Sequence, residues 1–298
     1  MSDFAALPDL RPLPGGYSGE TFVSDYGGRR VVVRVYGARS RRGPDAPQVD
    51  AAVMEMVRGL LPVPAVLEAR PADPDAGTPG LLITELLPGE RLDVVLPRLD
   101  DAHRELLGVR LGRLLGRLGH MVQPRTGLFG GPGLQLTPVP PEAADLPSWV
   151  AAHRDRLGWE ESDLAALESL AVDAQVVFDE EGRHCLVHSD FNPKNLLVDQ
   201  GTLRITGLVD WEFAHAGNPW SDLGNLLRFD REPCFVDGIL TGLSQLLPTV
   251  PDDVLERAHF ADLFALVELA ARAGENPVAD AAYDRLLRTV RARDPHDA

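Results

Sequence analysis

The sequence predicts an α+β protein with two lobes, a small antiparallel-sheet lobe over residues 1–88 and a mainly helical lobe over residues 89–298. Three observations support this fold class. Short β-rich runs separated by turn residues fill the first part of the chain, helical periodicity dominates the rest, and Pro88-Gly89 separates the two patterns. A chain of 298 residues is also long enough for two lobes of ordinary size.

The first lobe contains four β-rich runs and one helix in the order β, β, α, β, β. A strand pair is expected within residues 10–40, joined by the turn sequence at 25–28. Residues 48–60 place apolar side chains at helical spacing, and a proline ends that pattern. The apolar runs 63–67 and 81–87 then complete a small antiparallel sheet.

The second lobe is predicted to be mainly helical with two short β segments. Helical spacing occurs in three stretches, 106–118, 148–172 and 220–293. Residues 124–147 are rich in Pro and Gly and are expected to form a long surface connection. Residues 184–198 and 203–209 are β-rich, and the first of these segments is interrupted by polar residues.

Composition and charge exclude several classes of protein. The chain is 44% hydrophobic and 25% charged, as in soluble globular proteins. Its formal charge of −16 makes nucleic acid and anionic membranes poor partners. It contains no apolar run of about 18 residues and no basic-then-apolar leader, so we expect a cytoplasmic protein. Cys185 and Cys234 lack ligand-like spacing and are expected to be free thiols, and no feature indicates an oligomeric state.

The most informative stretch is the interrupted β segment around His188-Ser189-Asp190. Asp190 and Asn195 lie in a polar turn between apolar strands, and Asp210 ends the next strand. Magnesium is usually held by one or two carboxylates together with phosphates and water, so Asn195 and Asp210 are candidate metal ligands. Asp190 is the candidate group that orients a hydroxyl and accepts its proton. The alternative is that these side chains cap a turn, as Asn and Asp often do.

His188-x-Asp190-x-x-x-x-Asn195, followed by Asp210-Trp211, resembles the aminoglycoside phosphotransferase family, whose fold is similar to that of protein kinases. The resemblance covers roughly residues 14–290. It implies that Asp190 is the catalytic carboxylate, that Asn195 and Asp210 bind Mg²⁺, and that His188 supports the loop. The stretch 218–224 looks like the family's helix start, in which Asp222 would brace that loop.

The resemblance also implies a nucleotide site in the first lobe. The glycine-rich turn with Gly16, Ser18 and Gly19 would cover the phosphates, although a plain hairpin turn is an equal alternative. Kinase-like folds place a Lys on the third strand, paired to a helix Glu. Arg34 occupies that position here, with Glu55 as its expected partner; the alternative for Glu55 is an ordinary surface charge.

Three further residues are candidate contacts for the nucleotide. Residues 81–90 resemble the family's hinge between lobes, where the backbones of Glu85 and Leu87 would contact the purine of ATP, with GTP not excluded. Lys194 is the chain's single lysine and lies in the polar turn.

The acceptor is less well defined by the sequence. The family implies a cationic antibiotic, either an aminoglycoside or a peptide of the viomycin and capreomycin kind, and points to a role in antibiotic resistance. Glu212 and His215 are candidate acceptor contacts, and the acid-rich stretches 159–163 and 251–256 would attract a cation unless they are ordinary solvated surface. The alternatives are a metabolic kinase acting on choline, homoserine, methylthioribose or a sugar-like acceptor, and a non-catalytic pseudokinase.

Overall fold

The computed structural model describes residues 10–13, 20–37 and 42–292. The chain forms two compact units. The first comprises Met1–His103, Leu128–Thr137 and Pro193–Ala214, and the second comprises Arg104–Gly127, Pro138–Asn192 and His215–Ala298. The chain therefore enters the first unit three times, whereas the sequence predicted one division after residue 88.

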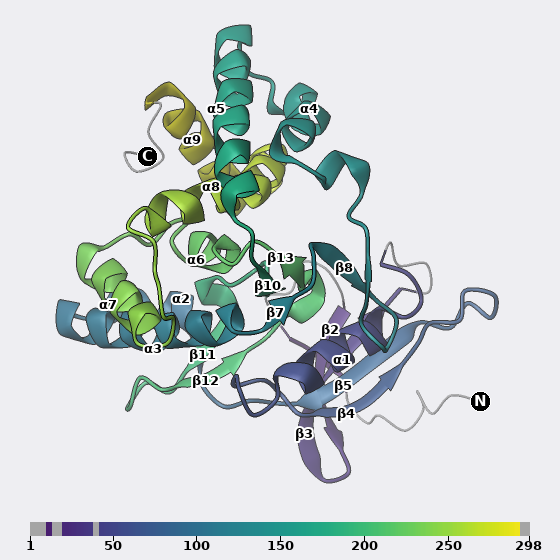
Figure 1. Ribbon diagram of the computed structural model, residues 1–298. Coiled ribbons are helices and arrows are strands. Elements are labelled where there is room, and N and C mark those ends of the chain that lie inside the picture. The colour runs from purple at the N-terminus through teal and green to yellow at the C-terminus, as the bar shows by residue number, and fades with distance from the viewer. Residues whose placement is uncertain (1–9, 14–19, 38–41, 293–298) are drawn as a thin grey trace. The chain divides into compact units, whose positions relative to one another are not determined.

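The first unit contains the expected antiparallel sheet (Figure 1). Its strand order is β1-β2-β3-β5-β4, with β1 Arg11–Pro12, β2 Glu20–Tyr26, β3 Arg29–Tyr36, β5 Gly80–Glu85 and β4 Val66–Arg70. Val31 and Val33 alternate along β3 and are fully buried against Leu81 and Ile83 of β5. This period-two burial follows from the pleat of a β-strand, and the strand itself was predicted from the β-rich run.

Helix α1, Ala46–Val57, packs against β4 and β5. It begins and ends slightly earlier than the predicted 48–60, and Pro47 lies in its first turn, where the missing N–H costs no hydrogen bond. The segment after the sheet forms the short helix α2, Leu92–Val95.

A small second sheet accounts for the return of the chain to the first unit. Strand β11, Leu196–Val198, pairs on one side with β12, Ile205–Leu208, and on the other with β6, Glu90–Arg91. The strand hydrogen bonds thus join residues near 90 to residues near 200. The predicted surface connection 124–147 is also partly wrong, because it contains a hairpin of β8, Gly127–Gly130, and β9, Gln135–Thr137.

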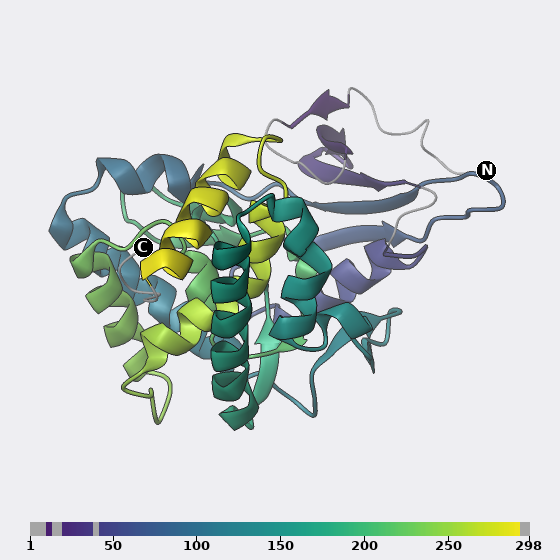
Figure 2. The same cartoon turned by 90° about the horizontal axis from the view of Figure 1, so that it is seen from above.

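The second unit is mainly helical (Figure 2). Its helices are α3 Asp101–Gly119, α4 Leu146–Leu157, α5 Glu161–Glu180, α6 Ser221–Leu226, α7 Pro233–Ser244, α8 Val254–Ala270 and α9 Pro277–Ala292. The side chains of α4, α5, α8 and α9 form one buried apolar cluster. Among the described residues, no helix is both long and apolar enough to cross a bilayer.

Three short strands of the second unit support the polar turn. β10, His184–Val187, lies between β7, Val122–Gln123, and β13, His215–Gly217, and both pairings are antiparallel. Strand β13 was not expected from the sequence. Cys185 in β10 is buried and Cys234 is partly exposed, and both are free thiols, as predicted.

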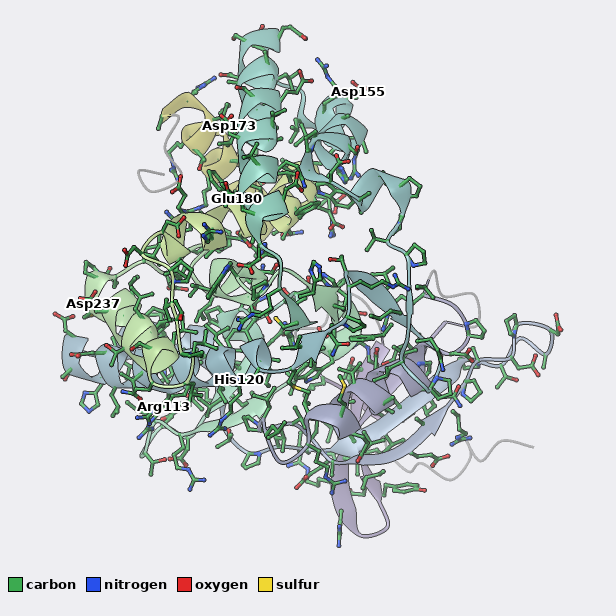
Figure 3. The ribbon with its side chains drawn as sticks, in the orientation of Figure 1. Arg113, His120, Asp155, Asp173, Glu180 and Asp237 are labelled. Atoms are coloured by element: carbon green, nitrogen blue, oxygen red, sulfur yellow. The ribbon has the colours of Figure 1, made fainter. Side chains whose placement is uncertain are left out.

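Helices α3 and α7 approach closely through glycines. A Cβ on Gly112 would lie 2.1 Å from the carbonyl oxygen of Ile239, and a Cβ on Gly242 would lie 2.2 Å from that of Val109. Beside this contact, Arg113, labelled in Figure 3, donates from Nε to Gln245 at 2.7 Å. The glycines let the two backbones pack directly on each other.

Candidate active site

The polar turn after β10 is held by Asp222 in the first turn of α6. The N–H groups of His188 and Ser189 donate to the two oxygens of the Asp222 carboxylate at 2.7 and 2.8 Å. Asp222 is 2% exposed, and this burial raises its pKa to about 7, against the opposing effect of the two N–H donors. Its side chain therefore anchors the backbone immediately before Asp190.

His188 and Asn192 orient the Asp190 residue from either side. His188 is fully buried, and its Nδ1 accepts a 3.3 Å hydrogen bond from the Asp190 N–H. The Asn192 amide donates to Asp190 Oδ1 at 2.5 Å, and Asp190 is half-buried. Ser189 has a φ of 67°, a left-handed conformation that is uncommon for Ser. The turn is thus held by one hydrogen bond to the Asp190 backbone and one to its carboxylate.

A second buried support was not found from the sequence. Asn225 of α6 accepts a 3.3 Å hydrogen bond from the Phe191 N–H and donates to Asp262 of α8 at 2.8 Å. Arg228 binds the same carboxylate through two contacts at 2.8 and 2.6 Å. A signal was present, because Asp222, Asn225 and Arg228 are polar residues at three-residue spacing in an otherwise apolar stretch.

The two candidate metal ligands lie in the first unit, on neighbouring segments. The Val209 N–H donates to the Asn195 carbonyl at 2.9 Å, next to the β11–β12 pairing. Asp210 follows with φ 68° and ψ 61°, a left-handed conformation, and its side chain is 29% exposed. The Trp211 indole donates to the Leu208 carbonyl at 3.0 Å and closes the turn. Asn195 and Asp210 are therefore brought to one end of the hairpin.

Arg34 on β3 binds the carboxylates that follow β12. Its Nη1 lies 2.6 Å from Asp210 Oδ1, and its Nη2 lies 2.7 Å from Glu212 Oε2. Burial by itself lowers the pKa of Arg34, but the nearby Asp210 and Glu212 charges outweigh this and raise it. The guanidinium carbon also lies 5.3 Å from the centre of the Tyr36 ring.

The expected pairing of Arg34 with Glu55 is wrong. Glu55 is exposed on α1 and pairs with Arg58 at 3.2 Å. The buried carboxylate of α1 is Asp50, which accepts from the Tyr36 hydroxyl at 2.6 Å and binds Arg42. Five residues turn a helix by about 140°, so Asp50 and Glu55 lie on different faces.

Arg42 extends the charged cluster, since its Nη1 lies 4.0 Å from Glu212. Glu212 was expected to face the acceptor, but its side chain is 7% exposed and its carboxylate lies between Arg34 and Arg42. That expectation is wrong, because the two guanidinium groups hold Glu212 inside the first unit. His215 begins β13 in the second unit, so the two candidate acceptor contacts belong to different units.

The remaining candidate nucleotide contacts lie in the first unit, apart from three that fall outside the described residues. Those three are Gly16, Ser18 and Gly19. On either side of them in the sequence, the Leu13 N–H donates to the Thr21 carbonyl at 2.8 Å. Glu85 uses its N–H to bind the Ala65 carbonyl at 2.9 Å, so its backbone would offer a purine only its carbonyl. Leu87 follows β5.

Lys194 lies in the 3₁₀ turn Pro193–Asn195, directly before the candidate ligand Asn195. Within the described ranges, no group of three or more His, Cys, Asp or Glu side chains would enclose a metal alone. One carboxylate and one amide at the end of a hairpin nevertheless suit Mg²⁺, which binds few protein ligands and completes its shell with phosphates and water. The residues present therefore fit a nucleotide-bound magnesium ion.

The chain is similar to one part of a larger curated protein. Mouse (Mus musculus) acyl-CoA dehydrogenase family member 10 is 26% identical over 222 residues, which are 72% of this chain and 20% of that protein. The chain thus spans about a fifth of the length of this curated relative.

Two solved structures share the fold. Aminoglycoside phosphotransferase APH(4)-Ia, in a ternary complex with ADP and hygromycin B, matches with a TM-score of 0.67 and 19% identity over 97% of this chain and 95% of that chain. A putative fructosamine-3-kinase from Haemophilus somnus matches with a TM-score of 0.64 and 14% identity over 95% of this chain and 91% of that chain. These matches confirm the predicted α+β, kinase-like fold.

The profile of the phosphotransferase enzyme family (APH) matches residues 9–260, and the chain belongs to this family.

Proposed function

We propose that the protein transfers the γ-phosphoryl group of ATP to a hydroxyl group of a small acceptor. The observation that carries the proposal is the hydrogen-bonded turn that holds Asp190 five residues before Asn195. Five residues span at most about 18 Å, so one short segment supplies both a proton acceptor and a metal ligand.

Each residue has a defined task in this reaction. Asp190 orients the acceptor hydroxyl and takes its proton as the oxygen attacks the γ-phosphorus and the bond to the bridging oxygen of ADP breaks. Asn195 and Asp210 would hold Mg²⁺, which neutralises charge on the phosphates when bound. Arg34 would bind the α- and β-phosphates, for which a guanidinium offers two donors. Lys194 and the backbones of Glu85 and Leu87 would complete the nucleotide contacts.

The acceptor that we propose is cationic, in the first place an aminoglycoside or a basic peptide antibiotic. Exposed carboxylates on the helices of the second unit support this choice, and Asp155, Asp173, Glu180 and Asp237 are labelled in Figure 3. The chain as a whole carries a formal charge of −16. Net negative charge raises the local concentration of cations. Phosphorylation of such an antibiotic would confer resistance to it.

A metabolic acceptor is the second candidate. It is favoured by the likeness to the putative fructosamine-3-kinase, because that likeness is about as strong as the likeness to the aminoglycoside enzyme. A non-catalytic pseudokinase is disfavoured, because Asp190, Asn195 and Asp210 are all present.

The proposal is tested by incubating the purified protein with Mg²⁺ and either ATP or GTP. The panel of acceptors contains aminoglycosides, viomycin-type peptides, choline, homoserine, methylthioribose and glycated amines, and mass spectrometry detects the added phosphoryl group. A phosphorylated antibiotic supports the first choice, and a phosphorylated metabolite alone supports the second. Nucleotide binding without any product across the panel would contradict catalysis and favour the pseudokinase.

A further inference from the structure

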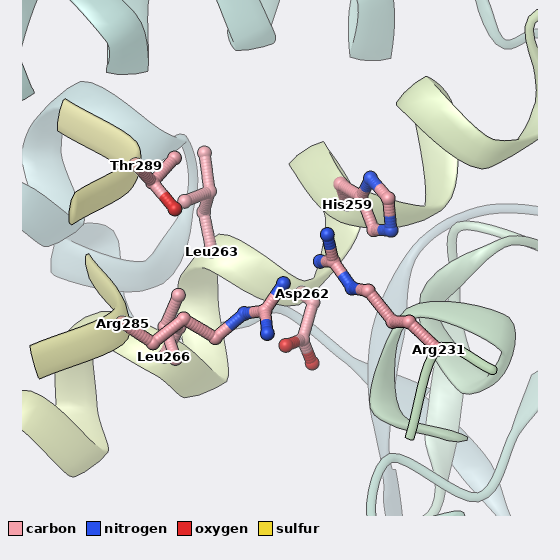
Figure 4. A pocket seen from close by; sticks show the side chains of 7 residues that line it. All are labelled: Arg231, His259, Asp262, Leu263, Leu266, Arg285 and Thr289. Atoms are coloured by element: carbon pink, nitrogen blue, oxygen red, sulfur yellow. The ribbon is translucent and has the colours of Figure 1, made fainter. Parts of the chain in front are cut away.

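A group of cationic side chains surrounds a small pocket in the second unit, away from the residues assigned above. Figure 4 shows it between α8, α9 and the segment that follows α6. Its polar lining consists of Arg231, His259, Asp262, Arg285 and Thr289, and two leucines complete the wall. In this view the guanidinium groups of Arg231 and Arg285 approach Asp262 from opposite sides.

The single carboxylate of this lining is already engaged. Asp262 Oδ1 accepts from Asn225 at 2.8 Å and from Arg228 at 2.6 Å, and Oδ2 accepts from Arg228 at 2.8 Å. Arg228 is as deeply buried as Asp262, so their charges offset each other. Arg285 therefore brings a further positive charge to a pocket whose single carboxylate already binds Arg228.

Arg285 carries the strongest indication of a ligand. Its side chain lies on α9 and the residue is 6% exposed, and its buried Nη2 has no hydrogen-bond partner among the residues that the structure describes. Burial, followed by the charge of Arg231, lowers the pKa of Arg285 to about 10, so it stays charged at neutral pH. A buried charged donor without an acceptor is costly.

The unfilled space between these side chains is about the size of one water molecule. Water would accept a hydrogen bond from Arg285 but would not offset its charge. We propose that the pocket binds a small anion, either a halide such as chloride or one oxygen of phosphate, against Arg285. The anion would supply the acceptor that Arg285 Nη2 lacks and a negative charge beside this guanidinium.

The site adjoins the second support of the catalytic turn. Asp262 binds Asn225, and Asn225 accepts from the Phe191 N–H, one residue after Asp190. The anion would therefore stabilise the folded second unit at this point. The anion site is independent of the proposed transfer reaction, since none of the residues that line the pocket is assigned to the nucleotide or the acceptor.

Thermal unfolding of the full chain tests the site. Chloride or phosphate is added at constant ionic strength in place of a bulky sulfonate buffer anion, in the absence of nucleotide. Because a ligand that binds only the folded state stabilises it, we expect the unfolding midpoint to rise by at least about 2 °C. The titrant that produces the rise distinguishes a halide from an oxyanion. A midpoint that does not change with either anion would overturn the proposal.

Two arginine variants on one helix show whether the rise comes from this pocket. Arg285→Gln should abolish it, whereas Arg288→Gln removes the same charge from an exposed position of α9 and should keep it. A rise that persists in Arg285→Gln would contradict the assignment. If Arg285→Gln does not fold, the wild-type protein crystallised with bromide decides the question. An anomalous peak beside Arg285 supports the site, and a pocket that holds water alone refutes it.

Discussion

At the scale of single residues, the candidate site depends on two side chains with different surroundings. Asp190 is held by His188 and Asn192 in a turn of the second unit. Arg34 lies between Asp210 and Glu212 in the first unit. The first position suits a group that exchanges a proton, and the second suits a permanent cation that exchanges its carboxylate partners for phosphate.

Asp190→Asn should lower kcat by about 10²- to 10⁴-fold, the usual contribution of a general base. The substituted amide can still accept from Asn192, so the unfolding midpoint should stay close to that of the wild type. The rate of phosphorylated-product formation is the measurement. Asp75→Asn, at an exposed position in the turn between β4 and β5, is the matched control and should retain full activity. A fully active Asp190→Asn enzyme would remove Asp190 from the reaction.

Arg34→Gln should weaken ATP binding by about tenfold or more, because a charge-assisted contact contributes roughly 1.5–3 kcal/mol. Arg34→Lys keeps the charge but loses the two-pronged geometry, so it should bind with intermediate affinity. Isothermal titration measures the affinity, and Arg58→Gln, which removes an exposed arginine from the end of α1, serves as the control. Unchanged affinity in Arg34→Gln would contradict the role of Arg34 in binding phosphate.

At the scale of elements, α6 determines the shape of the catalytic turn through one carboxylate. Asp222 accepts two backbone N–H groups although it is almost fully buried. The second unit also depends on close helix packing, because α3 and α7 meet through glycines.

Asp222 should make the folded state less stable as pH rises. The pKa of Asp222 is about 7 in the folded protein and 3.8 is the reference for the unfolded chain. Between about pH 4 and pH 7 the carboxyl group is therefore protonated mainly in the folded state. The free energy of unfolding should therefore fall, through this group, from about pH 4 to about pH 7 and then level off. Asp222→Asn should lack that component. Urea denaturation of both proteins across this range measures it, and parallel pH curves would contradict the assignment.

Gly112→Ala should lower the free energy of unfolding by about 1–3 kcal/mol, the usual cost of overpacking. The added methyl group would meet the backbone carbonyl of Ile239, which cannot rotate away. Gly182→Ala is the control, since its Cβ would have nothing within 4 Å. Chemical denaturation compares the two variants. A Gly112→Ala protein as stable as the control would show that the helices can separate at little cost.

At the scale of the whole molecule, the candidate machinery is distributed over both compact units. Asp190 and its supports belong to one unit, and Arg34, Asn195 and Asp210 belong to the other. The chain passes from one unit to the other between Asn192 and Pro193, inside the polar turn itself.

Removal of Mg²⁺ should abolish turnover and weaken ATP binding, because the ion would neutralise charge on the phosphates. Asp210→Asn should raise the Mg²⁺ concentration needed for half-maximal turnover by about tenfold or more, because one charged contact contributes on that order. Titration with Mg²⁺ at fixed ATP is the measurement. Glu55→Gln removes an exposed carboxylate from the same unit and should leave the titration unchanged. Equal Mg²⁺ requirements for wild type and Asp210→Asn would exclude Asp210 as a ligand.

Much of the fold was predictable because local patterns reflect local structure. The valine-rich run between glycine turns predicted β3, helical spacing predicted α1 and α3, and the spacing of Asp190 and Asn195 predicted the polar turn. The hairpin of β8 and β9 was missed, because its strands are only four and three residues long and lie among Pro and Gly.

The sequence by itself determined the order of the elements, the family resemblance and the candidate groups Asp190, Asn195 and Asp210. Only the tertiary structure decided which charges meet. Arg34 pairs with Asp210, 176 residues away, and not with the nearer Glu55. The cationic pocket likewise joins α8 and α9 to the segment after α6. Periodicity shows which face of an element is buried, but the partner of a charged side chain depends on which carboxylate folding brings within reach.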